Sequence, residues 1–144
     1  MRIVTTSADN TARLWRAADG RVQGVLRGHD GRVRGAAFSP DGAVVATVSS
    51  DRTARLWKTA DGSEITVLRG HEKYLAAAAF DGQGKRLVTA SADGTARIWD
   101  VASGTQTAVL RGHGTYVNAA VFSPDGTRVA TASWGDQTAR LWNA

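Results

Sequence analysis

Three sets of histidine, serine, aspartate and tryptophan recur along the chain, and serine, histidine and aspartate together suggest nucleophilic hydrolysis. The sets are His29, Ser49, Asp51 and Trp57; His71, Ser91, Asp93 and Trp99; and His113, Ser133, Asp136 and Trp142. In a hydrolase of this kind the histidine removes the serine proton, and the aspartate orients the imidazole. The sets contain every histidine of the chain, so any histidine chemistry must use one of them.

A structural interpretation of these sets is favoured over a catalytic one. A hydrolase needs one such set, whereas this chain has three. Donors and acceptors also balance without a substrate, because the indole N–H can donate to the serine, the serine to one imidazole nitrogen, and the other nitrogen to the aspartate. No Gly-x-Ser-x-Gly sequence surrounds any serine, so the usual turn of a hydrolase nucleophile is missing. We therefore expect closed, non-catalytic networks.

The same residues make a poor metal site. Zinc needs several ligands that converge, and each histidine stands alone in its own repeat. The Asp-Gly pairs lack the spacing of a calcium-binding loop and are typical of chain reversals. The sequence predicts neither a metal nor a cofactor.

A spacing of 42 residues organises the whole chain. It separates Arg27-Gly28-His29, Arg69-Gly70-His71 and Arg111-Gly112-His113, and also Phe38, Phe80 and Phe122. The tryptophans at 15, 57 and 99 share it, and Trp142 follows one residue late because of an insertion near Trp134. A period of this length indicates a repeat architecture.

Turn residues divide each unit into short strands. In the first complete unit we expect strands at about residues 33–38, 44–49, 53–57 and 63–68. The alanine-rich segment 75–80 favours a helix by propensity alone. It is short, flanked by turns and in phase with 33–38, so we expect a strand there as well. Repeated four-stranded antiparallel sheets predict an all-β fold made of β-propeller blades.

The order of motifs resembles the WD-repeat β-propeller family over essentially the whole chain. Gly-His is followed by Ser-Pro-Asp-Gly and then by Ser-x-Asp-x-Thr-x-Arg-Leu-Trp. Only Trp99 is followed by the aspartate that gives the family its name. The resemblance implies that a Trp–Ser–His–Asp network ties the loop before the first strand to the second and third strands of each blade.

The expected strands are too few to close a propeller ring. Fourteen strands give about 3.5 blades, with a partial blade at 1–27, blades at 28–69 and 70–111, and a partial blade at 112–144. Propellers usually have four to eight blades, and a half-ring exposes apolar faces and strand edges. The chain is therefore either a fragment of a longer protein or one member of a homo-oligomer. We favour a dimer that closes a ring of seven or eight blades.

The resemblance also implies that partners dock on the loops of one rim. Tyrosine, tryptophan and arginine are enriched at interaction hot spots, and side chains of these or related kinds vary between repeats at the expected loop positions. The candidate partner-binding residues are Arg32, Arg34, Arg52, Lys73, Tyr74, Tyr116, Asn118 and Trp134.

Composition narrows the function further. A net charge of +5 suggests nucleic acid, but the arginines are dispersed, so we do not favour such a partner. No apolar run reaches the 18 residues of a membrane span, and cysteine is absent, which fits a cytoplasmic protein. The excess of arginine over lysine, fifteen to three, and the abundance of alanine suggest a bacterial source. We expect a non-catalytic scaffold for protein–protein interaction. The alternatives are a regulatory or sensor fragment of a larger bacterial signalling enzyme, and an amplified or engineered repeat array.

Overall fold

A computed structural model describes residues 1–144 as fourteen β-strands joined by turns. The strands are β1 (Arg2–Thr6), β2 (Ala12–Arg16), β3 (Val22–Leu26), β4 (Val33–Phe38), β5 (Val44–Ser49), β6 (Ala54–Lys58), β7 (Glu64–Leu68), β8 (Leu75–Phe80), β9 (Arg86–Ser91), β10 (Thr95–Asp100), β11 (Gln106–Arg111), β12 (Ala119–Phe122), β13 (Arg128–Ser133) and β14 (Thr138–Asn143). The expected number of strands and the all-β fold class are confirmed.

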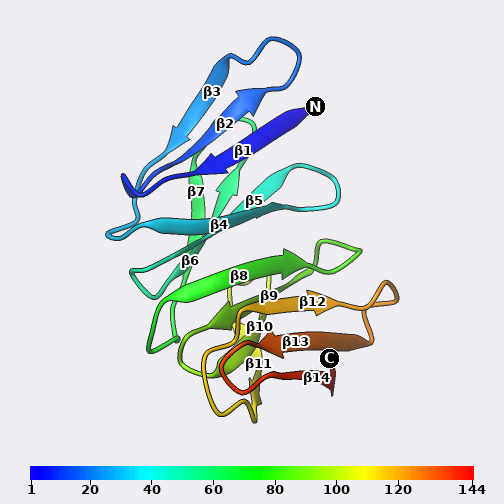
Figure 1. Ribbon diagram of the computed structural model, residues 1–144. Helices are drawn as coiled ribbons and strands as arrows, with labels where there is room; N and C mark the ends of the chain where they lie inside the picture. Colours follow the sequence, from blue (N-terminus) through cyan, green and yellow to red (C-terminus); the bar gives the residue numbers. More distant parts are fainter.

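The strands form four small antiparallel sheets. Sheet 1 holds β1–β3, sheet 2 holds β4–β7, sheet 3 holds β8–β11 and sheet 4 holds β12–β14. Each strand pairs with its neighbours in sequence, so every sheet is a meander. Figure 1 shows the sheets following one another from the N-terminal to the C-terminal end without closing a ring. Sheet 1 lacks the first strand of the repeat, and sheet 4 lacks the fourth.

The turn between the first and second strands of sheet 2 shows why this sequence reverses the chain. The Ser39 hydroxyl donates to Asp41 Oδ1 at 2.5 Å, and the Ala43 amide donates to the same oxygen at 3.0 Å. Gly42 follows with φ of 70°, a left-handed conformation that costs glycine little. The next strand begins at Val44, so the turn sets where β5 starts.

The alanine-rich segment forms strand β8, as its phase in the repeat predicts. It pairs with β9 along its length, and β4, β8 and β12 contact one another in succession. These first strands lie side by side through the array in Figure 1. The small side chains of Ala76–Ala79 are half-buried and let neighbouring sheets approach closely. Tertiary packing therefore outweighs the helix propensity of alanine.

Apolar layers between successive sheets form the core. We call the side of a sheet that faces the next sheet in sequence its forward face, and the opposite side its backward face. The forward face of sheet 2 contributes Ala46, Val48 and Leu56, and the backward face of sheet 3 contributes Leu75 and Leu87. Equivalent layers join sheets 1 and 2 and sheets 3 and 4. Each sheet is thus stabilised mainly by its neighbours.

The two outermost faces have no neighbouring sheet. Leu141 on the forward face of sheet 4 is 69% exposed, whereas Ile98, at the same place in sheet 3, is 2% exposed. Ile3 on the backward face of sheet 1 is 46% exposed, whereas its equivalent Val45 is fully buried. The chain contains no helix long and apolar enough to cross a membrane.

Candidate functional site

Each histidine pairs with the aspartate that the sequence associates with it. Nδ1 of His29 and of His71 lies 2.7 Å from the carboxylate of Asp51 and of Asp93, respectively. The third pair, His113 and Asp136, is separated by 2.9 Å. Each histidine precedes the first strand of its sheet, and each aspartate lies in the turn between the second and third strands. The pair therefore holds two loops together on one rim.

The hydroxyl in each network is a threonine and not the expected serine. In sheet 2 the Trp57 indole donates to Thr47 Oγ1 at 2.8 Å, and His29 Nε2 lies 2.8 Å from the same oxygen. Thr89 and Thr131 have the same role in sheets 3 and 4. The predicted places of Ser49, Ser91 and Ser133 in the networks are therefore wrong. The observed order is Trp–Thr–His–Asp.

The serine and the threonine lie on the same side of the second strand, which explains the error. They are two residues apart, and side chains on one side of a strand recur with that spacing. The Ser49 hydroxyl lies at the strand end, where it donates to Gly31 O at 2.8 Å and accepts from the Asp51 amide at 3.1 Å. Thr47 lies one step deeper, level with the indole. Threonine recurs at 47, 89 and 131 with the 42-residue spacing, but serine recurs at 49, 91 and 133 in the same way, so the spacing did not distinguish the two hydroxyls.

Hydrogen bonding fixes one tautomer of each histidine. The ionised carboxylate accepts only, so Nδ1–H donates to it and Nε2 accepts from the threonine hydroxyl. Burial is the largest influence on the pKa of His29 and lowers it below its usual value, although Asp51 acts in the opposite direction. Burial acts to raise the pKa of Asp51, but hydrogen bonds from Thr53 and His29 outweigh it and the pKa is lowered. A neutral imidazole beside an ionised carboxylate follows for this pair.

The networks resemble a hydrolytic triad in order but not in access. The hydroxyl, imidazole and carboxylate follow one another as in a serine hydrolase. Thr47 and Thr89 are fully buried, and their oxygens also accept the indole N–H. A substrate carbonyl therefore has no route to the hydroxyl. No group of three or more histidine, cysteine, aspartate or glutamate side chains is placed to hold a metal ion.

A buried arginine explains the glycine before each of the first two histidines. Arg55, in β6, donates to Glu64 on the neighbouring strand at 2.5 Å. Its guanidinium occupies the space beside Gly28, where an added Cβ would lie 2.7 Å from Nη1. Gly70 has the same relation to Arg97. The glycine of each of these two Arg-Gly-His motifs therefore packs against the arginine that lies two residues before the tryptophan of the same sheet.

The predicted partner-binding residues all lie on or beside the loops at one end of the sheets, the end where the three histidines lie. We call these loops the histidine rim; they comprise residues 7–11, 27–32, 50–53, 69–74, 92–94, 112–118 and 134–137. The structure brings two pairs of the candidates together. The Arg34 guanidinium lies 4.0 Å from the centre of the Tyr74 ring, and Asn118 accepts the backbone amide of Trp134 at 2.8 Å.

The other four candidates make no side-chain contact of this kind. Arg32, Arg52 and Lys73 are exposed and form no side-chain hydrogen bond or ion pair, and Tyr116 is half-buried without a hydrogen bond. Trp134 is 79% exposed on the inserted turn. The histidine rim thus has two layers. The hydrogen-bonded networks form its inner layer, and exposed side chains with free polar groups form its outer layer.

Comparison with known families identifies the repeat. The family model for the WD domain, G-beta repeat, matches residues 20–58, 62–100 and 104–143. The chain belongs to the WD40 repeat family. WD40 domains typically act as scaffolds for protein interactions. A comparison with curated proteins found no significant match.

The WD40 matches are offset from the sheets of the fold. The first match begins just before β3 of sheet 1 and ends with β6 of sheet 2, and the next two repeat this pattern. One WD40 unit therefore contains the fourth strand of one sheet and the first three of the next. The chain connects each pair of neighbouring sheets within a single unit.

Proposed function

We propose that this WD40 chain is a non-catalytic scaffold for protein interaction that completes its ring by self-association. Its polar networks are closed on themselves, and their hydroxyls are inaccessible. The histidine rim would be the docking surface, with Arg32, Arg34, Arg52, Lys73, Tyr74, Tyr116, Asn118 and Trp134 as contact residues. The support for this role is the combination of a rigid inner layer with free side chains above it.

The observation that carries the proposal of self-association is the forward face of sheet 4. Cross-strand pairing places six apolar side chains on it: Ala119, Val121, Ala130, Ala132, Ala139 and Leu141. In sheet 3 the equivalent side chains include Val88, Ala90, Ala96 and Ile98, and all four are buried against sheet 4. The forward face of sheet 4 thus has the composition of a buried face but no neighbouring sheet to cover it. Contiguous apolar surface of this kind marks an interaction site.

The complementary surface lies at the opposite end of the chain. The backward face of sheet 1 carries Ile3 and Trp15, whose equivalents Val45 and Trp57 in sheet 2 are buried against sheet 1. We infer that sheet 4 of one copy docks on sheet 1 of a second copy, in the way that successive sheets dock within the chain. Head-to-tail contacts of this type close a ring when the rotation permits. Two copies supply eight sheets, a number at which propellers close.

Light scattering after size-exclusion chromatography tests this proposal. We expect the wild-type chain of 15.2 kDa to elute at twice that mass. Leu141→Asp places a charge on the docking face and should give a folded monomer, because an unpaired charge in an apolar interface is costly. Thr127→Asp, on an exposed turn of the same sheet, should leave the dimer intact. A folded wild-type monomer at all concentrations would refute the self-association.

A further inference from the structure

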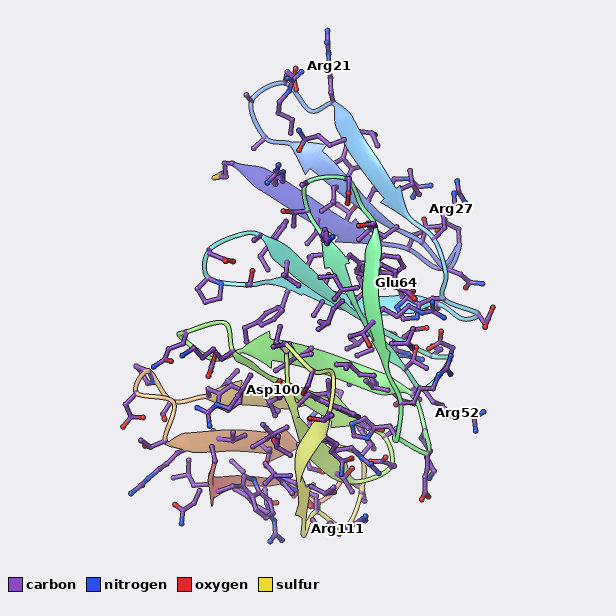
Figure 2. All side chains as sticks on the ribbon, turned by 180° about the vertical axis from the view of Figure 1, so that it is seen from behind. Arg21, Arg27, Arg52, Glu64, Asp100 and Arg111 are labelled. Carbon is purple, nitrogen blue, oxygen red and sulfur yellow. The ribbon has the colours of Figure 1, made fainter.

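Seven exposed cations of the histidine rim are without an ion pair. They lie in its loops or at the ends of the adjoining strands, and none forms an ion pair: Arg27, Arg32, Arg34, Arg52, Arg69, Lys73 and Arg111. Figure 2 shows Arg27, Arg52 and Arg111 projecting away from the sheets. Asp30 and Glu72 are the exposed carboxylates beside them that are without a side-chain partner. The surface therefore presents an excess of unpaired positive charge.

The remaining carboxylates of the histidine rim do not serve these cations. Asp51, Asp93 and Asp136 turn inward, and their oxygens accept hydrogen bonds from an imidazole, a threonine and backbone amides. Asp9 pairs with Arg13 at 2.9 Å. The hydrogen-bonding capacity of these carboxylates is thus used within the protein. The exposed guanidinium groups above them are therefore free to bind a carboxylate from outside the chain.

The opposite rim differs in charge. Its turns carry five aspartates, at 19, 41, 61, 81 and 125, but only two cations, Arg21 and Lys85. Of the cations at the strand ends there, Arg16 pairs with Asp19 and Arg86 with Asp81, whereas Arg2, Lys58 and Arg128 form no ion pair. On the opposite rim the turn aspartates thus outnumber the unpaired cations, whereas on the histidine rim the seven unpaired cations outnumber the free carboxylates.

Arg34 is held in a position suited to binding a carboxylate. Its Nε donates to Ser50 Oγ at 2.8 Å, and its guanidinium stacks on the Tyr74 ring at 4.0 Å. These contacts leave both Nη groups without a hydrogen bond. A stacked arginine loses little further freedom when it binds, and its two Nη groups can meet a carboxylate in a bidentate pair. Arg32 and Arg52 lie in the loops on either side.

We propose that the histidine rim binds an acidic, extended segment of a partner protein, with carboxylates at Arg32, Arg34 and Arg52. This inference rests on the scaffold role proposed above and specifies its partner. At these three arginines a peptide is favoured over nucleic acid, because the Tyr74 ring is covered by Arg34 and the exposed indole of the rim, Trp134, belongs to sheet 4. Asp30 and Glu72 also interrupt the cations, which suits spaced carboxylates better than a continuous phosphate backbone.

Fluorescence polarisation with a labelled peptide of alternating glutamate and leucine tests the inference. We expect binding that weakens with salt, and no binding of the same peptide with glutamine in place of glutamate. A triple variant, Arg32→Ala, Arg34→Ala and Arg52→Ala, should raise Kd about tenfold or more. The control removes the same charge from the opposite rim, through Arg21→Ala, Lys58→Ala and Arg128→Ala, and should keep the wild-type Kd.

Three outcomes would overturn the inference. The wild type does not bind the glutamate peptide, the two triple variants lose affinity equally, or a labelled oligothymidine of the same length binds more tightly than the peptide. Light scattering on the rim variant separates this result from the scaffold proposal. If the variant assembles like the wild type while peptide binding fails in the wild type, self-association stands and the acidic partner is rejected.

Discussion

The identity of one hydroxyl separates the predicted network from the observed one. The balance of donors and acceptors correctly required a hydroxyl between the tryptophan and the histidine. It could not distinguish Thr89 from Ser91, because both lie on one side of β9 and both can donate and accept. Depth along the strand decides, since Thr89 is level with Trp99. Depth is a property of the register between strands, which the residue types alone do not determine.

Replacing the threonine should therefore destabilise the chain more than replacing the serine. Thr89→Val keeps the shape of the side chain but leaves the Trp99 N–H and the His71 Nε2 buried without a partner. We expect a loss of about 2 kcal/mol or more in the free energy of unfolding. Ser91→Ala removes a hydroxyl that bonds Lys73 and Tyr74 carbonyls and should cost about 1 kcal/mol. Urea denaturation at a fixed protein concentration measures both.

The reverse order of stability would contradict the observed network. An ester-hydrolysis assay on the wild type and on Thr89→Val also tests whether the network is catalytic. An ester-hydrolysis activity in the wild type that disappears in Thr89→Val would contradict the non-catalytic role, because it would require a substrate to reach a fully buried hydroxyl.

At the scale of elements, the strands were more predictable than the contacts between them. Phase within the repeat correctly assigned residues 75–80 to a strand against the local propensity of alanine. The expected third strand at 53–57 is observed one residue later, at Ala54–Lys58. Thr53 instead closes the turn through hydrogen bonds to Asp51. The equivalent Thr95 makes the same hydrogen bonds to Asp93 and yet is the first residue of β10, so these bonds do not decide where the third strand begins.

Replacing the glycine before a histidine tests the contact between the loop that carries it and the arginine of the third strand. Gly70→Ala would place a Cβ 2.6 Å from Arg97 Nη1, so the buried arginine would have to move away from Gln106. We expect a loss of about 1 to 3 kcal/mol in the free energy of unfolding. Gly24→Ala, in strand β3, meets nothing within 4 Å and should change stability by less than about 0.5 kcal/mol. Equal effects in thermal unfolding would refute this contact.

For the whole molecule, the sequence predicted the number of strands, the incomplete ring and its apolar terminal faces, but not which side chains lie on those faces. Exposure of Leu141 depends on which side of β14 faces outward, and that side follows from the pairing of Ala130 with Leu141. A hollow of about 600 Å³ lies between the start of β1 and the turn that joins β4 to β5; its lining includes Met1, Arg2 and Asp41.

Thermal stability should depend on protein concentration if copies associate through their terminal faces. Association stabilises only the folded state, so the melting temperature should rise by about 2 °C for each tenfold increase in concentration. Leu141→Asp should remove this dependence while leaving a cooperative transition. Differential scanning calorimetry over two decades of concentration provides the measurement. A wild-type melting temperature that stays constant over this range would argue against a dimer.

The offset between repeat and sheet has a consequence for how such a molecule can change in length. Each unit begins in the fourth strand of one sheet and ends in the third strand of the next. Duplication or loss of one 42-residue unit would therefore add or remove a sheet inside the array and leave both outermost surfaces as they are. Duplication of one repeat within the gene would therefore change the circumference of the ring in a single event. No second mutation would be needed to restore the contact between the two terminal sheets.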